Sequence, residues 1–167
     1  GLDIGVAVNV SPHSLRTVDF THRVGRALRE RGVPPRSLTL EVTESLAFDI
    51  PEAVERLTPL RQLGVKISVD DFGTGYTSLS VLPRLPLDEL KVDQQFVRAM
   101  LTSSASDAIV RSVLELAHRL GLSAVAEGVE DGALAERLAE YGYDVLQGYH
   151  FSRPVPEGEL IAQLADR

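Results

Sequence analysis

The stretch Val65-Lys66-Ile67-Ser68-Val69-Asp70-Asp71-Phe72-Gly73-Thr74-Gly75-Tyr76 decides the fold and locates a candidate site. Its first five residues form a largely apolar run that predicts a strand, and a glycine-containing loop follows the two acids. Successive side chains of a strand point to opposite faces, so Asp70 and Asp71 can act together only where the strand gives way to the loop. There they could bind a divalent cation, although a polar strand end before a glycine turn is an equally simple interpretation of this motif alone.

Strand patterns and helix patterns alternate along the whole chain. We expect strands at Gly5–Val10, Leu38–Val42, Val65–Val69, Glu89–Val92, Ser123–Ala126 and Asp144–Leu146. We expect helices near Val18–Arg31, Pro51–Leu63, Ala105–Leu120, Ala133–Tyr141 and Glu157–Ala165. Such alternation predicts parallel strands joined by right-handed crossovers, which is an α/β fold.

Polar residues at the strand ends favour a (β/α) barrel over an open doubly wound sheet. They are Asn9, Glu41 with Glu44, Asp70 with Asp71, Lys91 with Asp93, Glu127, and Gln147. A barrel gathers the carboxyl ends of all its strands on one rim, whereas an open sheet gathers only those near its switch point. Six strands and 167 residues fall short of the eight strands and roughly 250 residues of a closed barrel. We therefore predict a TIM-like (β/α) barrel that is incomplete, with about six of its eight strands.

The composition is that of a globular protein, with 44% hydrophobic and 25% charged residues. The length suits one domain over residues 1–167, and no linker interrupts it. A formal net charge of −7 argues against bulk nucleic acid as a partner. Without a long apolar run or a signal segment, we expect a cytoplasmic location and no membrane contact by this segment. Lysine occurs only at Lys66 and Lys91, and all other basic residues except histidines are arginines.

Six motifs in order and approximate spacing resemble EAL domains, the bacterial phosphodiesterases that hydrolyse cyclic di-GMP. The motifs are Asn9-Val10-Ser11, Leu40-Glu41-Val42-Thr43-Glu44, Asp70-Asp71-Phe72-Gly73-Thr74-Gly75-Tyr76-Thr77-Ser78-Leu79, Leu90-Lys91-Val92-Asp93, Ala126-Glu127-Gly128-Val129-Glu130 and Gln147-Gly148-Tyr149-His150-Phe151-Ser152-Arg153-Pro154. The resemblance covers nearly the entire chain. It implies hydrolysis of cyclic di-GMP to linear pGpG by a two-metal mechanism in the parent domain.

The resemblance also assigns metal ligands. Asn9, Glu41 and Asp70 match the first metal ligands of the family, and Asp70 with Asp71 matches the bridge to a second ion. Oxygen ligands suit Mg²⁺ or Mn²⁺. Two such ions about 3.5–4 Å apart can activate water and stabilise the leaving oxygen of a phosphodiester. Inhibition by Ca²⁺ is expected from the family.

Further roles follow from the same resemblance. Lys91 matches the lysine near the attacking water, and Glu127 matches the glutamate that activates water or binds the second metal. Gln147 matches a residue that helps to hold that water. Glu44 matches a residue that stabilises the Asp-Asp loop.

The loop after the two acids matches a dimer interface in the family. Its residues are Phe72, Gly73, Thr74, Gly75 and Tyr76. We expect them to form a switch that couples dimerisation to the metal site, and the full domain to be a homodimer. The resemblance further implies that the parent protein carries sensory or GGDEF-type domains.

The Glu-Ala-Leu motif that names the family is absent from this sequence. Glu52-Ala53-Val54 is a near match, but it lies in the first turn of a predicted helix. By analogy with the family, the chain lacks its N-terminal strands and one metal ligand, so we expect its activity to be impaired. The alternative function is a non-catalytic cyclic di-GMP receptor or a protein-interaction or regulatory module. A third possibility is a metal-dependent barrel that acts on another phosphodiester.

Overall fold

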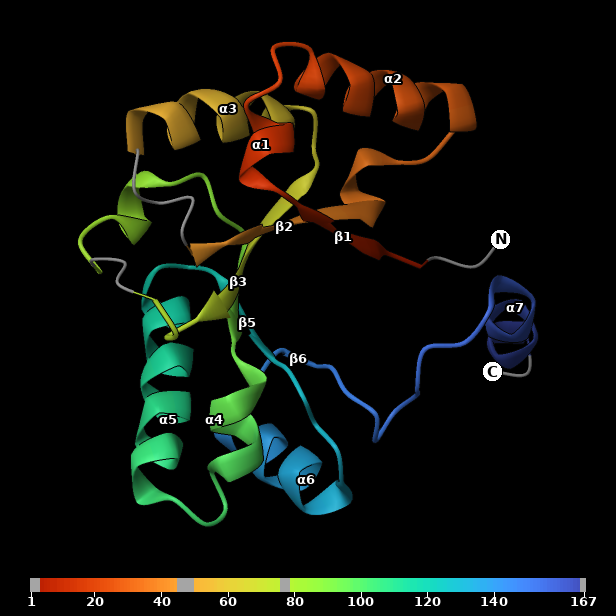
Figure 1. Ribbon diagram of the computed structural model, residues 1–167. Coiled ribbons are helices and arrows are strands. Elements are labelled where there is room, and N and C mark those ends of the chain that lie inside the picture. The colour runs from red at the N-terminus through yellow and green to blue at the C-terminus, as the bar shows by residue number, and fades with distance from the viewer. Residues whose placement is uncertain (1–3, 45–49, 76–78, 166–167) are drawn as a thin grey trace.

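The protein forms a single parallel sheet, seen in a computed structural model that describes residues 4–44, 50–75 and 79–165. Within these ranges the strands lie in the order β1-β2-β3-β4-β5-β6 (Figure 1). Their bounds are β1 Val6–Val10, β2 Leu38–Thr43, β3 Lys66–Phe72, β4 Glu89–Val92, β5 Ser123–Ala126 and β6 Val145–Leu146. The order follows the chain without a reversal, so there is no switch point of a doubly wound sheet. The predicted fold class, an incomplete (β/α) barrel, is confirmed.

Helices connect the strands and cover one face of the sheet. They are α1 Pro12–Leu15, α2 Phe20–Arg31, α3 Ile50–Gln62, α4 Gln94–Ala99, α5 Ser104–Arg119, α6 Gly132–Tyr141 and α7 Glu157–Ala165, with short 3₁₀ segments η1 Pro35–Ser37 and η3 Leu82–Arg84. Helix α3 packs on β3, and α5 packs on β4 and β5. Helix α7 lies apart from the other helices, at the end of an extended segment (Figure 1). Among the described helices, none is long and apolar enough to cross a membrane.

Three boundaries differ from the sequence predictions in ways that affect the site. Strand β3 does not end at Val69 but continues through both acids to Phe72. Helix α4 was not predicted, because six residues are too few to show a helical period. Helix α1 was also missed, although Ser11 caps it by accepting a hydrogen bond from Ser14 N–H at 3.1 Å. The other elements agree within about two residues, which is the usual uncertainty of an element end.

The core lies between the helices and the face of the sheet that they cover. Alternate strand residues point to this face and are buried apolar side chains: Leu40, Val42, Ile67, Val69, Leu90, Val92, Ala124 and Ala126. The helices contribute Leu57, Leu60, Val110, Val113, Ala117, Leu134 and Leu138. Because the period of a strand is two residues, the intervening residues point to the opposite face, which is the interior of the barrel.

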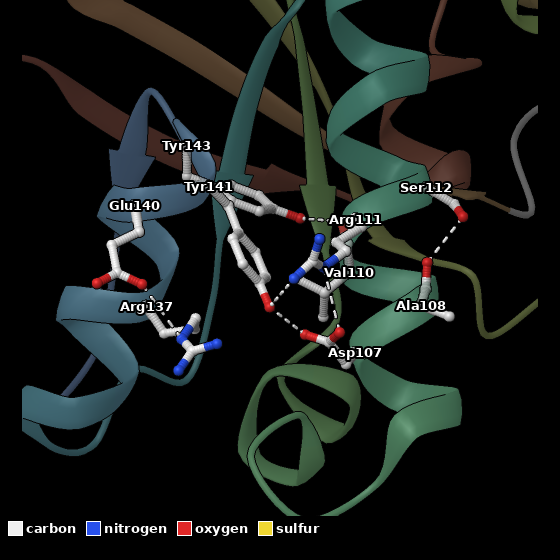
Figure 2. A network of polar contacts seen from close by, with 9 residues as sticks. All are labelled: Asp107, Ala108, Val110, Arg111, Ser112, Arg137, Glu140, Tyr141 and Tyr143. Atoms are coloured by element: carbon white, nitrogen blue, oxygen red, sulfur yellow. Dashed lines mark hydrogen bonds and ion pairs between the residues drawn. The ribbon is translucent and has the colours of Figure 1, made fainter.

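A polar contact at the outer surface joins α5 to α6 (Figure 2). The Tyr141 hydroxyl donates to Asp107 Oδ1 at 2.5 Å and accepts from Arg111 Nη2 at 2.8 Å. The Arg111 guanidinium also lies over the Tyr141 ring, with its carbon 4.1 Å from the ring centre. We call these three residues the α5–α6 clasp. Beside it, the Tyr143 hydroxyl donates to the Val110 carbonyl at 2.8 Å, so the segment after α6 is also attached to α5.

Candidate active site at the strand ends

The carboxyl ends of four neighbouring strands place a buried lysine among three carboxylates. Lys91 Nζ, at the end of β4, lies 2.5 Å from Glu41 Oε1 on β2 and 3.1 Å from Asp70 Oδ1 on β3. It also contacts the carboxylate of Glu127, which follows β5. The Lys91 side chain is 3% exposed. A buried ammonium needs such partners, because removing an unpaired charge from water is costly.

These contacts set the protonation of the cluster. Burial alone lowers the pKa of Lys91, but the hydrogen bonds that its ammonium donates to Glu127 and Glu41 outweigh this effect and leave that pKa above the ordinary lysine value. Burial raises the pKa of Glu127 to about 7, against the opposing effect of Lys91. The charge of Asp70 adds to the rise. Glu127 therefore combines a position beside a fixed positive charge with a proton affinity suited to exchange near neutral pH.

An irregularity in β3 brings the two adjacent acids to one place. The pairing of β3 with β4 shifts register between Val69 and Phe72, and Asp71 has a left-handed backbone with φ 55°. One carboxylate oxygen from each of Asp70, Asp71 and Glu127 lies within 4.8 Å of the others. Two acids that follow each other in a regular strand would diverge, so the bulge is what makes this grouping possible.

Burial and neighbouring acids favour the protonated form of Asp71. Burial raises the pKa of Asp71, and the charge of Asp70 and a hydrogen bond with Asp93 raise it further. Asp93 also caps α4, where it accepts a hydrogen bond from Gln95 N–H at 2.7 Å. Asp93 thus caps a helix and also contacts Asp71, and this contact was not predicted. The sequence did contain one indication of this contact, because Asp93 comes directly after the strand that carries Lys91.

Glu44 supports the loop that follows the two acids. Its carboxylate accepts hydrogen bonds from the backbone N–H groups of Gly73 at 3.1 Å and Gly75 at 3.0 Å. A Cβ at Gly75 would lie 2.9 Å from the Glu44 carboxyl carbon, so a larger residue there would displace the Glu44 carboxylate. This is the geometry that a loop-stabilising Glu44 needs.

The predicted switch loop is described only in part. Phe72 is buried, and Thr74 Oγ1 donates to the Asp71 carbonyl at 2.9 Å. Gly73 has φ 100°, and a Cβ there would lie 3.1 Å from the Phe96 ring. Tyr76 lies outside the described residues. A groove of about 630 Å³ opens between this loop and α5, and is lined by Phe72, Gly73, Leu79, Ala108, Ile109, Ser112, Val113, Glu115, Leu116 and Arg119.

The two remaining predicted residues lie at the sides of the cluster. Asn9 on β1 is the register partner of Glu41 on β2, so the two side chains share the interior face. Gln147 follows β6, and its backbone carbonyl accepts a hydrogen bond from Val129 N–H at 3.1 Å. That bond fixes Gln147 beside the loop that begins at Glu127. The next residue, Gly148, was missed: a Cβ there would lie 2.1 Å from the Val129 carbonyl oxygen.

The donor set suits a hard divalent cation. Asp70, Asp71 and Glu127 offer carboxylate oxygens in one cluster, and Glu41 and Asn9 add oxygens on the same rim. Carboxylate and amide oxygens are the ligands that Mg²⁺ and Mn²⁺ prefer, and the chain has no cysteine to favour a softer metal. The residues present therefore fit the metals that the sequence predicted.

Comparisons with known proteins agree with this fold. The family model described as "EAL domain" matches residues 1–154. Cyclic di-GMP phosphodiesterase RocR of Pseudomonas aeruginosa is 40% identical over 162 residues, which are 96% of this chain and 41% of the relative. The chain spans between 20% and 41% of the length of the curated relatives that it matches.

Solved structures similar to this chain include complexes with cyclic di-GMP. The "PaMucR Phosphodiesterase, c-di-GMP complex" superposes with a TM-score of 0.89 at 41% identity, covering 93% of this chain and 64% of that one. The manganese and cyclic di-GMP complex of Klebsiella pneumoniae BlrP1 superposes with a TM-score of 0.83 at 37% identity, covering 90% of this chain and 39% of that one.

Proposed function

Since this chain belongs to the EAL domain family, we propose that its parent protein hydrolyses cyclic di-GMP to linear pGpG with two Mg²⁺ or Mn²⁺ ions. The observation that carries the proposal is the contact of buried Lys91 with Glu41, Asp70 and Glu127 at one rim of the barrel. Relatives named as cyclic di-GMP phosphodiesterases, such as RocR, support the substrate.

The metal would be held by oxygens at the strand ends. Asn9, Glu41 and Asp70 would bind the first ion, and Asp70 and Asp71 would face the second. When bound, the ions supply a nucleophilic water and neutralise charge on the phosphodiester. The manganese in the related BlrP1 complex supports a divalent ion here.

The chain itself orients the reactants and handles the proton. Glu127 is placed to accept a proton from the attacking water, since its carboxylate belongs to the same cluster as Asp70 and Asp71. Lys91 stays charged and offsets the negative charge that develops at phosphorus. Gln147, fixed beside the Glu127 loop by its backbone, would orient the water.

The test measures conversion of cyclic di-GMP to pGpG by chromatography, with the natural full-length protein in Mg²⁺ or Mn²⁺. Glu127→Gln keeps the shape but removes the proton acceptor, so kcat should fall about 100-fold or more. Glu140→Gln is the matched control, because Glu140 is exposed on α6, away from the strand ends, and pairs with Arg137 one turn earlier. Its kcat should stay within about twofold of the unmodified protein.

Two outcomes would contradict the proposal. If calorimetry shows tight binding of cyclic di-GMP in both Ca²⁺ and Mg²⁺ but no pGpG forms, the protein is a receptor. If cyclic di-AMP or unrelated diesters compete equally and are hydrolysed equally well, the substrate assignment is wrong.

A further inference from the structure

The interior face of the sheet carries a continuous polar row in its middle layer. The strand register aligns one residue from each of five strands: Asn9, Glu41, Ser68, Glu89 and Ser123. Side chains at one register position of parallel strands share a face, so all five belong to the same layer. Bulky branched apolar residues usually fill the interior of a (β/α) barrel. The polar side chains of this layer need hydrogen-bonding partners, whereas apolar side chains in the same place would need none.

Ser68 occupies the centre of the row and is 0% exposed. Its hydroxyl has no hydrogen-bond partner among the residues that the structure describes. Buried hydroxyl groups in proteins are almost always paired, either with protein or with ordered water. The register neighbours of Ser68 are Glu41 on β2 and Glu89 on β4, so carboxylates lie on both sides of this short side chain.

Charged residues continue the polar interior above and below Ser68. Towards the catalytic rim, Glu41 contacts Lys91. Towards the opposite end of the strands, Glu89 Oε1 lies 3.3 Å from Lys66 Nζ, which is half exposed. Lys66 and Lys91 are the two lysines of the whole sequence, and both belong to this column. Ser68 is the neutral residue that lies between the two ion pairs in the register.

We propose that Ser68 holds ordered water inside the barrel and acts as a positioning residue for Glu41. The serine hydroxyl donates to the water, and the water donates its two hydrogens to the carboxylates of Glu41 and Glu89. This satisfies the Ser68 hydroxyl and fixes the rotamer of Glu41, whose other oxygen contacts Lys91. Removing a side chain that orients a metal ligand commonly lowers metal affinity or activity, even though that side chain does not touch the metal.

The structural test is a high-resolution crystal structure of the natural full-length protein. We expect an ordered water within about 2.7–3.2 Å of Ser68 Oγ and of one carboxylate oxygen each of Glu41 and Glu89. In Ser68→Ala, this water should be lost or shifted, and the Glu41 carboxylate should move from Lys91. A Ser68 hydroxyl that donates directly to a protein atom, with no water beside it, would overturn the proposal.

The kinetic test rests on the proposed function. With cyclic di-GMP as substrate, Ser68→Ala should lower kcat about 10-fold, with KM within about twofold. Ser68→Thr, which keeps the hydroxyl, should restore kcat. The matched control is Thr102→Val, which removes an exposed hydroxyl that donates to the Ala99 carbonyl between α4 and α5, and its kcat should not change.

The two tests separate this inference from the proposed function. If the unmodified protein does not hydrolyse cyclic di-GMP, the proposed function fails, and the crystal structure alone decides whether the water exists. If the protein is active but Ser68→Ala keeps full kcat, Ser68 is only a small packing residue and the positioning role is wrong. If Ser68→Ala does not fold, two results still test the proposal. They are the electron density for the water in the unmodified protein and the kcat of Ser68→Thr.

Discussion

Asp144, at the entrance to β6, connects two elements through a single carboxylate. Its Oδ2 accepts a hydrogen bond from Ala124 N–H at 2.8 Å and lies 2.9 Å from His118 Nε2. The backbone hydrogen bond from Ala124, reinforced by His118, lowers the pKa of Asp144 below its ordinary value. A carboxyl group of this kind stabilises the fold at pH values above its unfolded-state pKa, and this contribution is lost as the pH falls through the folded-state pKa.

We therefore predict that Asp144→Asn lowers the free energy of unfolding at pH 7, and that the difference from the unmodified protein shrinks below about pH 4. The effect at pH 7 should be about 0.5 kcal/mol, because the side chain is 44% exposed and solvent screens the charge. Urea unfolding at several pH values measures it. The control is Asp19→Asn, because Asp19 precedes α2 without a side-chain capping bond. A difference that does not change with pH would contradict the argument.

The sequence indicated which residues are candidates for the site but not how they meet. Glu41, Asp70, Lys91 and Glu127 each stand at a strand end, which the local pattern could show. Their contacts require four strands to pair in register, and no local pattern contains that information. The bulge that turns Asp71 beside Asp70 was also beyond the sequence, because it depends on how β3 pairs with β4.

Among the elements, α5 and α6 are joined by the α5–α6 clasp. Tyr141→Phe removes the hydroxyl that donates to Asp107 and accepts from Arg111, while it keeps the ring. We predict a loss of about 1 kcal/mol in the free energy of unfolding, the usual net value of such a hydrogen bond. Tyr149→Phe, at an exposed position beyond β6, is the control and should leave stability unchanged. Equal stability of both variants would show that the Tyr141 hydroxyl contributes nothing to the stability of the clasp.

Helix α5 also presents the groove between itself and the loop after β3, and we propose that a second copy of the domain occupies it. Leu79 lines this groove and is 59% exposed, so Leu79→Asp should weaken the dimer without disturbing the core. We predict a dimer Kd raised about 30-fold, as for an interface residue that contributes about 2 kcal/mol. Leu101→Asp, an exposed leucine outside the groove, is the control. Sedimentation equilibrium of the full-length protein measures both, and an undiminished dimer in Leu79→Asp would place the interface elsewhere.

Long elements were predicted better than short ones. Helix α5 shows its apolar stripe over four turns, and its bounds differ from the prediction by one residue. Helix α4 has six residues between Asp93 and Met100, and its sequence alone is typical of a loop. Its helical state depends on the Asp93 cap and on burial of Val97. Strand β3 was cut short in the prediction, because two charged residues usually mark the end of a buried strand.

At the scale of the whole molecule, the sheet has two edges. Strand β1 ends the strand order on one side and β6 on the other. On β1, Val6 is 56% and Val8 is 44% exposed. Unpaired backbone groups beside exposed apolar side chains form a template for pairing with another chain.

We predict that these 167 residues, expressed alone, associate through the strand edges and hydrolyse cyclic di-GMP far more slowly than the full-length protein. Light scattering with intact mass should give particles larger than the 18.2 kDa monomer. Val8→Lys places a charge beside the β1 edge and should reduce the association. A stable, fully active monomer would show that β1 and β6 do not need to pair with a further strand.

The strand order described above also determines how the molecule can be assembled during synthesis. Each strand pairs with the one translated just before it, from β1 to β6. Every βα unit that leaves the ribosome therefore meets a partner that is already complete, and no early strand has to wait for a later one to be inserted beside it. Domains generally fold as units, with the N-terminal ones first during synthesis. In this protein, the order of the described strands in the sheet matches the order of their synthesis, and Gln147, which follows β6, is the last of the candidate site residues to leave the ribosome.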